Sequence, residues 1–257
     1  MKRSFNIFFC FLLILFKSQT PKQEKNLSIL EVKYNFSYLE DTLNAKNLIS
    51  EPMILLTNGK KSLYYSENDK AFSDGFKKQL DAAIKTGSIV EPGKLLQSKV
   101  RHSVYKDNDS LYISNYLGRD FYTIYVEGIH WKIDNLTNKI IQGYKCTKAV
   151  AKVGRRTYIA WFTYDVPIND GPYKFKGLPG LILKVNDESQ YFNFELLSIT
   201  KINLPISYKK GLLITKDQYL AKRKEYSNDP SQGKINTPAY RKRINENKNK
   251  FNNFLEE

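Results

Sequence analysis

Residues 161–185 read WFTYDVPINDGPYKFKGLPGLILKV, a stretch in which three prolines and three glycines are mixed with aromatic and aliphatic side chains. Few loops are this apolar. Pro179 presets φ and Gly180 tolerates φ > 0, as the second and third positions of a type II turn require. We therefore predict a turn between two strands here, with Gly180 at positive φ and with Leu178 and Leu181 directed inward.

Alternating side chains and turn signals on both sides of this stretch predict a mainly β fold with antiparallel neighbours. Apolar residues occupy every second position of Ile29–Leu39, which indicates a half-buried strand. Asn58-Gly59 predicts a hairpin with a type I′ turn, and a second hairpin is expected around Asn186–Ser189. A turn is expected at Asn135–Asn138. It interrupts a meander of strands at Val100–Tyr105, Leu111–Leu117, Phe121–Val126, Ile129–Asp134, Lys139–Val150 and Arg156–Thr163.

Three helices are predicted from periodicity and capping. An apolar residue recurs every four positions from Phe72 to Ile84, with Asp69 as the expected N-cap and Gly87 as the expected stop. This apolar stripe should cover a sheet or plug a barrel mouth. Thr215–Tyr226 begins with capping-box spacing, and Thr237-Pro238 opens a last helix. We expect one β-rich domain over residues 19–226 and a basic, partly helical or disordered tail over 227–257.

The start of the chain has the pattern of an export signal. Lys2 and Arg3 precede an apolar run of ten residues, Ile7 to Phe16. A membrane span needs about 20 apolar residues, so this run is too short for one. We expect a cleaved signal peptide over residues 1–18 and a periplasmic destination, with extracellular release less favoured and no transmembrane span in the mature protein.

The chain is strongly basic. Its formal net charge of +15 falls to +12 without Lys2, Arg3 and Lys17, and residues 201–257 hold thirteen Lys or Arg against six Asp or Glu. In an exported protein this charge favours anionic headgroups or acidic glycans over nucleic acid as partners, whereas the alternative is simply a solvated basic surface. Cys146 is the one cysteine after the signal, so we expect no intramolecular disulfide and a buried thiol.

Residue patterns for catalysis and metal binding are weak. His102 and His130 lie in no ligand spacing, so we expect one histidine in the core or at an edge and the other in solvent. No metal, cofactor or catalytic residue is predicted. A carboxylate pair among Asp165, Asp170 and Asp187 stays open as an alternative, although aspartates beside Pro, Gly or Asn are typical of turns.

Aromatic residues make up 14% of the chain and cluster in the predicted meander. They either line a pocket for an apolar ligand or serve as ordinary strand residues, which aromatics favour. The candidate lining residues are Trp131, Tyr144, Tyr158 and Phe162.

Several motifs resemble the GLPGLI family of exported proteins from Gram-negative bacteria. The residues that carry this resemblance are Gly177, Leu178, Pro179, Gly180, Leu181 and Ile182, together with Cys146, Trp161, Gly171, Pro172 and Phe175. The family has no assigned activity and no established catalytic residues. The last six residues depart from the ending of many members, which leaves a role for the terminus open.

A more distant similarity is to periplasmic lipoprotein-carrier-like folds. It implies an incomplete antiparallel barrel with the Phe72 to Ile84 helix near its concave side. Together these resemblances imply a non-enzymatic cell-envelope protein that binds, transports or assembles an apolar ligand or partner. The alternative is an envelope hydrolase that uses carboxylates near the Pro/Gly segment.

Overall fold

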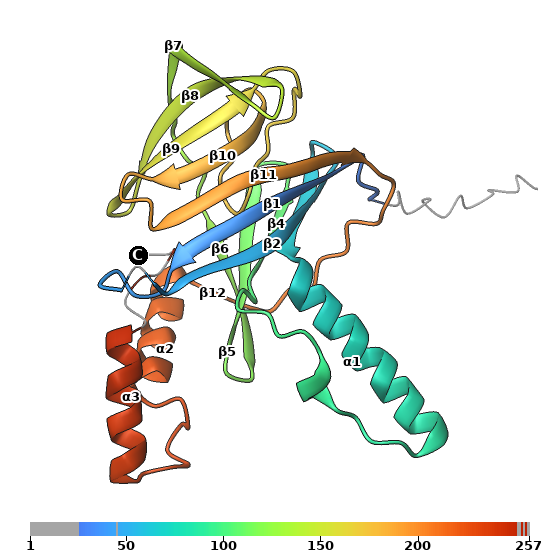
Figure 1. The fold of residues 1–257 in the computed structure, drawn as a ribbon, viewed down its shortest axis with the longest axis vertical. Helices are drawn as coiled ribbons and strands as arrows, with labels where there is room; N and C mark the ends of the chain where they lie inside the picture. Colours follow the sequence, from blue (N-terminus) through green and yellow to red (C-terminus); the bar gives the residue numbers. More distant parts are fainter. Residues whose placement is uncertain (1–25, 45, 251–252, 254, 256–257) are drawn as a thin grey trace, which may run out of the picture.

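The computed structural model describes residues 26–44, 46–250, 253 and 255 (Figure 1). The predicted signal peptide lies outside these residues. The described chain forms one open twelve-stranded sheet in the order β12-β6-β5-β4-β3-β2-β1-β11-β10-β9-β8-β7, with three α-helices. Within this described part, every neighbouring pair is antiparallel except β12 and β6. The predicted mainly β, antiparallel fold is therefore confirmed.

Two meanders, β2 to β6 and β7 to β11, are joined through β1, which pairs with β2 on one side and β11 on the other. The first meander contains β2 (Leu48–Thr57), β3 (Lys61–Ser66), β4 (Ser103–Asp107), β5 (Ser110–Leu117) and β6 (Asp120–Val126). The second contains β7 (Lys132–Ile141), β8 (Tyr144–Val153), β9 (Arg156–Thr163), β10 (Leu181–Asp187) and β11 (Phe192–Lys201). The remaining elements are β1 (Leu30–Leu39), β12 (Leu212–Ile214), α1 (Glu67–Thr86), the 3₁₀ turn η1 (Pro92–Lys94), α2 (Lys216–Asn228) and α3 (Pro238–Lys250).

The predicted hairpin of β2 and β3 is present, but its turn is not type I′. Gly59 has φ 86°, whereas Asn58 does not have a positive φ. The Asn58 side chain instead accepts hydrogen bonds from the N–H groups of Lys60 (3.1 Å) and Lys61 (2.7 Å). Because the side chain closes the turn, the backbone of Asn58 has no need of a left-handed conformation.

The turn predicted at Asn135–Asn138 is a bulge inside β7. The register with β8 shifts between Asp134 and Asn138, where the Asp134 carboxylate accepts hydrogen bonds from the N–H of Leu136 and the hydroxyl of Thr137. The chain reverses later, at Gln142 (φ 46°) and Gly143 (φ 86°). The polar residues of Asn135–Asn138 therefore indicate a bulge within one strand and not the end of that strand.

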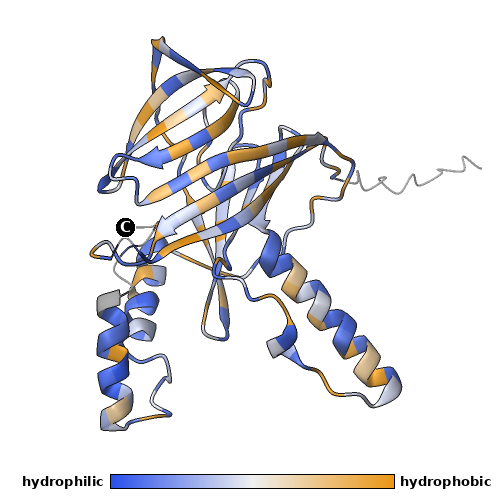
Figure 2. Ribbon diagram, in the orientation of Figure 1, coloured by the Kyte–Doolittle hydropathy of each residue, from blue (hydrophilic) through white to orange (hydrophobic). Residues whose placement is uncertain are grey.

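Helix α1 differs from the prediction in its N-cap and in the exposure of its apolar stripe. Its N-cap is Ser66, whose hydroxyl accepts a hydrogen bond from the N–H of Asp69 at 3.0 Å, while Gly87 ends it at φ 71° as expected. The predicted burial of its apolar stripe is wrong. Among the described residues of α1 none is buried, Ile84 is 76% exposed, and the helix projects away from the sheet (Figures 1 and 2).

An irregular segment between β9 and β10, residues 164–180, packs against the buried face of the sheet. Residues 170–176 are all buried. The Phe175 ring is fully buried, with its centroid 4.8 Å from that of Tyr158 and 5.5 Å from that of Phe194. This segment supplies apolar side chains to the main core. The buried face of the sheet is therefore covered by the segment and not by the apolar stripe of α1.

The predicted type II turn at the end of this segment is also wrong. Gly180 does not have a positive φ, and the positive value belongs to Gly177 at 102°. A Cβ on Gly180 would lie 2.0 Å from the carbonyl oxygen of Thr163. Gly180 therefore permits a close approach of two backbones. Leu178 and Leu181 are buried, as expected.

Gly180→Ala should destabilise the protein by about 2 kcal/mol, because the added methyl group must displace the Thr163 backbone. Pro179→Ala should cost less, since Pro179 is exposed and its loss mainly frees the unfolded chain. Urea midpoints at equal m-value measure both effects. Gly128→Ala is the matched control, because a Cβ there has no neighbour within 4 Å. Equal midpoints for the Gly180 and Gly128 variants would contradict the close-approach explanation.

The C-terminal helices lie together beside β5 and β6 (Figure 1). The predicted capping box of Thr215 and Gln218 opens α2, and Pro238 opens α3 as predicted. Tyr219 of α2 is buried, and its hydroxyl accepts a hydrogen bond from Asn115 Nδ2 at 3.0 Å. The short strand β12, which carries the chain into α2, was not predicted.

Candidate functional site

A cavity of about 1150 Å³ lies between the sheet and the helices α2 and α3. We call it the helix–sheet cavity. Ligand pockets usually measure about 300–1000 Å³, so this one has room for a sizeable molecule. Apolar and aromatic side chains from both walls line it, among them Phe36, Tyr38, Ile113, Ile124, Phe192, Tyr219, Leu220 and Ile244.

Three stacked rings on two neighbouring strands form an aromatic floor. The centroid of Phe36 lies 4.9 Å from that of Tyr38 and 6.4 Å from that of Phe192, and the interplanar angles are 17° and 11°. β1 and β11 pair here, so the side chains of alternate residues lie next to one another on one face. Burial raises the pKa of Tyr38, and the nearby Glu40 adds to the increase. The Tyr38 hydroxyl therefore stays neutral, and the three rings carry no charge.

The chain after α3 is attached to the sheet through Asn253. Its side-chain amide donates to the carbonyl oxygen of Leu39 at 2.6 Å and accepts from Arg156 Nη2 at 2.5 Å. Arg156 also donates to the carboxylate of Asp187 at 3.3 Å. These contacts fix the far end of the helical wall to β1 and β9.

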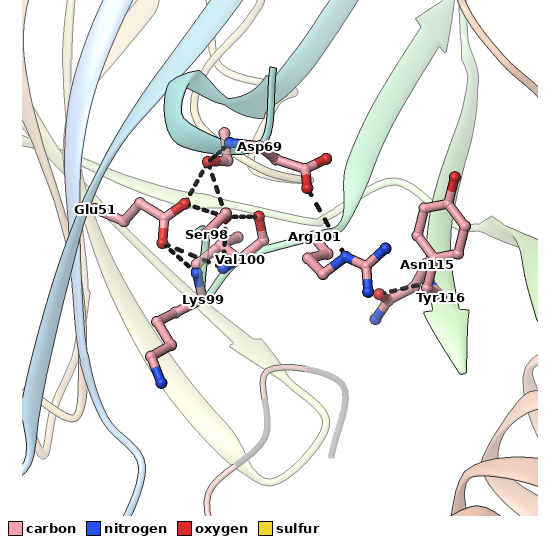
Figure 3. Close-up of polar contacts among 9 residues, drawn as sticks. Glu51, Asp69, Ser98, Lys99, Val100, Arg101, Asn115 and Tyr116 are labelled. Atoms are coloured by element: carbon pink, nitrogen blue, oxygen red, sulfur yellow. Dashed lines mark hydrogen bonds and ion pairs between the residues drawn. The ribbon is translucent and has the colours of Figure 1, made fainter. Parts of the chain in front are cut away.

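A buried carboxylate, Glu51 of β2, organises the opposite wall (Figure 3). It accepts hydrogen bonds from the hydroxyls of Ser66 and Ser98. It also accepts from the N–H groups of Lys99 at 2.9 Å and Val100 at 3.2 Å. Because Ser66 caps α1, one side chain ties β2, α1 and the segment before β4 together.

Arg101 lies at the cavity, next to this network (Figure 3). Its Nε is 3.8 Å from the Asp69 carboxylate, and its guanidinium lies 4.6 Å from the ring centroid of Tyr116. Burial raises the pKa of Asp69, while Arg101 acts in the opposite direction and Glu51 adds to the increase. An aspartate and an aromatic ring thus orient the guanidinium.

Positive charge dominates the cavity lining. Among the described residues that line it, none is Asp or Glu, and seven are Lys or Arg: Lys99, Arg101, Arg155, Lys216, Arg223, Lys224 and Lys248. They come from the segment before β4, the β8–β9 turn and both C-terminal helices. The cavity therefore combines an aromatic floor with cationic walls.

The predicted motif residues serve the core and lie away from this cavity. A Cβ on Gly171 would meet the Phe175 carbonyl oxygen at 2.5 Å, and Pro172, Leu181 and Ile182 are buried. Gly177 is exposed, and its N–H donates to Asn169 Oδ1. The motif thus shapes the segment that fills the core.

Cys146 and Trp161 lie farther along the same sheet. Cys146 is fully buried, as expected, and burial raises the pKa of its thiol to about 11. Trp161 is partly exposed, opposite Lys148 and Lys184 in the strand register, and Lys139 Nζ lies 3.9 Å from its ring centroid. Neither arrangement indicates a reactive group.

The four aromatic residues expected to line a pocket are not among the described residues that line the helix–sheet cavity. Tyr158 and Phe162 are buried in the core, and Trp131 Nε1 donates to the carbonyl oxygen of Lys176 at 2.8 Å. Tyr144 is partly buried at the start of β8. The actual lining residues come from distant parts of the chain. The excess of Lys and Arg after residue 200 was the one sequence signal that pointed to them.

Two of the three aspartates near the Pro/Gly segment have structural partners. Asp170 is buried, forms an ion pair with Lys106 at 2.8 Å and accepts from the Thr57 hydroxyl at 2.8 Å. Asp187 accepts from Arg156 and from the N–H of Phe192. Asp165 is exposed. None of the three lies among the described residues that line the cavity.

His102 is half-buried with its ring 5.0 Å from that of Tyr173, and His130 is exposed, as expected for one core or edge histidine and one solvated one. Within the described part of the chain, no three His, Cys, Asp or Glu residues are grouped as a metal site would need. Of the helices described, none combines the length and the apolar character of a membrane span.

Residues 153–184 match a protein family described as "Protein of unknown function (Porph_ging)". This segment includes Trp161, Phe175 and the run Gly177–Ile182, so the match supports a likeness to an uncharacterised family and indicates no activity. No curated protein matches the chain.

Solved structures show a related fold. Two crystal forms of PNGF-II are 17% and 18% identical, with TM-scores of 0.53 and 0.52. The matches cover 77% and 76% of this chain but only 33% and 32% of PNGF-II, so the chain spans about a third of that protein. An uncharacterized conserved protein from Thermus thermophilus is 10% identical at a TM-score of 0.35, over 75% of this chain and 94% of that one. At 17% and 18% identity the likeness to PNGF-II concerns the fold alone.

Proposed function

We propose that this protein is a non-enzymatic binding protein of the cell envelope that holds an apolar ligand or partner segment in the helix–sheet cavity. The stacked floor of Phe36, Tyr38 and Phe192 is the observation that carries the proposal. Binding would remove from water the apolar side chains of the lining that are still partly exposed, such as Tyr38 beside the stacked rings and Leu220 of α2, which contributes about 25 cal/mol per Å² buried. Export rests on the pattern of residues 1–18.

The alternative, an envelope hydrolase, has less support. Hydrolysis by paired carboxylates requires two acids at a cleft, separated by about 5 to 10 Å in glycosidases. Asp170 and Asp187 are instead held by Lys106 and Arg156. Among the described lining residues of the cavity, no carboxylate is present to act as acid or base.

A cavity-filling substitution tests the proposal. Nile red, a neutral apolar dye, is titrated with the mature protein, and Leu220→Trp on α2 is expected to weaken its binding at least about tenfold by occupying the cavity. Leu136→Trp is the control, because Leu136 is 95% exposed on β7. Equal affinity of Leu220→Trp and the wild-type protein would refute the cavity as the site. Mass spectrometry of lipid extracted with the periplasmic protein would identify a natural occupant.

A further inference from the structure

The cavity's charged and apolar residues differ in depth. Phe36, Ile124 and Phe192 are each 2% exposed, whereas the basic residues Lys99, Arg155 and Lys224 are exposed to solvent. Apolar groups therefore form the floor and cations form the rim. A ligand that enters this site meets an aromatic surface inside and positive charge at the mouth.

The bias toward cations exceeds that of the whole chain. The whole sequence has 41 Lys and Arg against 26 Asp and Glu. At that ratio, a lining with seven cations would also be expected to contain several acids. The described lining residues include seven cations and no acid, although Asp69, outside the lining, lies 3.8 Å from Arg101 Nε. Like charges that surround one concave site raise its potential and concentrate anions there.

We propose that the ligand is an anionic amphiphile: a single-chain molecule whose carboxylate or phosphate head lies among the rim cations and whose hydrocarbon part covers the aromatic floor. This inference rests on the proposed function and adds the charge of the ligand. Arg155, which is exposed, can bind a carboxylate or phosphate with two parallel N–H donors. An extended polyanion would leave the partly exposed apolar side chains of the lining, such as Tyr38 and Leu220, in water, which is why a small amphiphile fits better.

Competition with bound Nile red tests the charged head and the hydrocarbon chain of the proposed ligand separately. Dodecanoate and dodecyl phosphate should displace the dye at concentrations at least about tenfold lower than methyl dodecanoate, which has the same chain and no charge. The difference should shrink in high salt, because exposed charges are screened. Inorganic phosphate alone should displace nothing. Displacement by inorganic phosphate would overturn the requirement for a hydrocarbon chain.

Charge reversal at the rim provides the second arm. Arg155→Glu combined with Lys224→Glu should remove the preference for dodecanoate while leaving methyl dodecanoate unchanged. Lys222→Glu is the matched control, because Lys222 is on the same helix, near Tyr122 and outside the described lining. Equal displacement by acid and ester in the wild-type protein, or a preference that survives in the double variant, would overturn the anionic head and leave the proposed function standing. Failure of every chain-bearing compound to displace the dye, or failure of the dye to bind, would overturn both.

Discussion

Lys106→Ala is expected to destabilise the protein by about 4 kcal/mol, because it leaves the Asp170 carboxylate buried without its cation. The two side chains are only 4% and 5% exposed, with Nζ 2.8 Å from Oδ2. Lys106 Nζ also donates to the carbonyl oxygens of Asn169 at 2.9 Å and Gly59 at 3.2 Å. One ammonium group thus joins the β2–β3 turn to the core-filling segment. Urea unfolding measures the loss.

Lys70→Ala is the matched control for Lys106→Ala. Lys70 pairs with Asp74 at 2.7 Å on the surface of α1, where both side chains are more than half exposed. Such pairs contribute roughly 0.3–0.5 kcal/mol, so the control should barely move the midpoint. Asp170→Asn in the Lys106→Ala background should recover part of the loss, because it removes the uncompensated charge. A loss below about 1 kcal/mol for Lys106→Ala would show that water reaches Asp170.

Local signals predicted those elements whose formation depends on nearby residues. The alternation in β1, the β2–β3 hairpin, the capping box at Thr215 and the stop at Gly87 are all present. In each case the side chains that determine the conformation lie within a few residues of one another, so their pattern can be read from the sequence.

The predictions that were wrong depended on contacts between distant residues. The stripe of α1 was expected to cover a sheet, but Phe175 and its neighbours in the β9–β10 segment already fill that core. The role of Gly180 depends on Thr163, which approaches it only in the folded chain. Turn propensity alone therefore assigned Gly180 the wrong backbone conformation.

The cavity was hidden in the sequence for the same reason. Its floor comes from β1, β6 and β11, and its rim from the segment before β4, the β8–β9 turn and the C-terminal helices. No window of neighbouring residues contains the site. Composition did indicate an excess of basic residues near the C-terminus, and the structure places several of these at the rim.

The Glu51 network links the stability of the fold to the shape of the cavity wall. Glu51→Ala should destabilise the protein by about 3 kcal/mol, because it removes the acceptor for two hydroxyl and two backbone N–H donors at a site where the carboxylate is 2% exposed. Urea unfolding measures this loss, and Glu127→Ala, at an exposed position, is the control. A destabilisation equal to that of the control would mean that water replaces the carboxylate.

The same variant should weaken the preference for dodecanoate over its methyl ester. Glu51 holds the N–H groups of Lys99 and Val100, and Arg101 follows directly in the chain. Without this anchor, the segment that presents Lys99 and Arg101 to the cavity gains freedom, and binding must then immobilise it again at a cost in affinity. Glu51→Gln keeps the shape and one acceptor oxygen but turns an amide toward the donors, so its effect on both unfolding and preference should be intermediate. If Glu51→Ala lowers stability yet leaves the preference of the folded protein unchanged, the network supports the fold without positioning the rim cations.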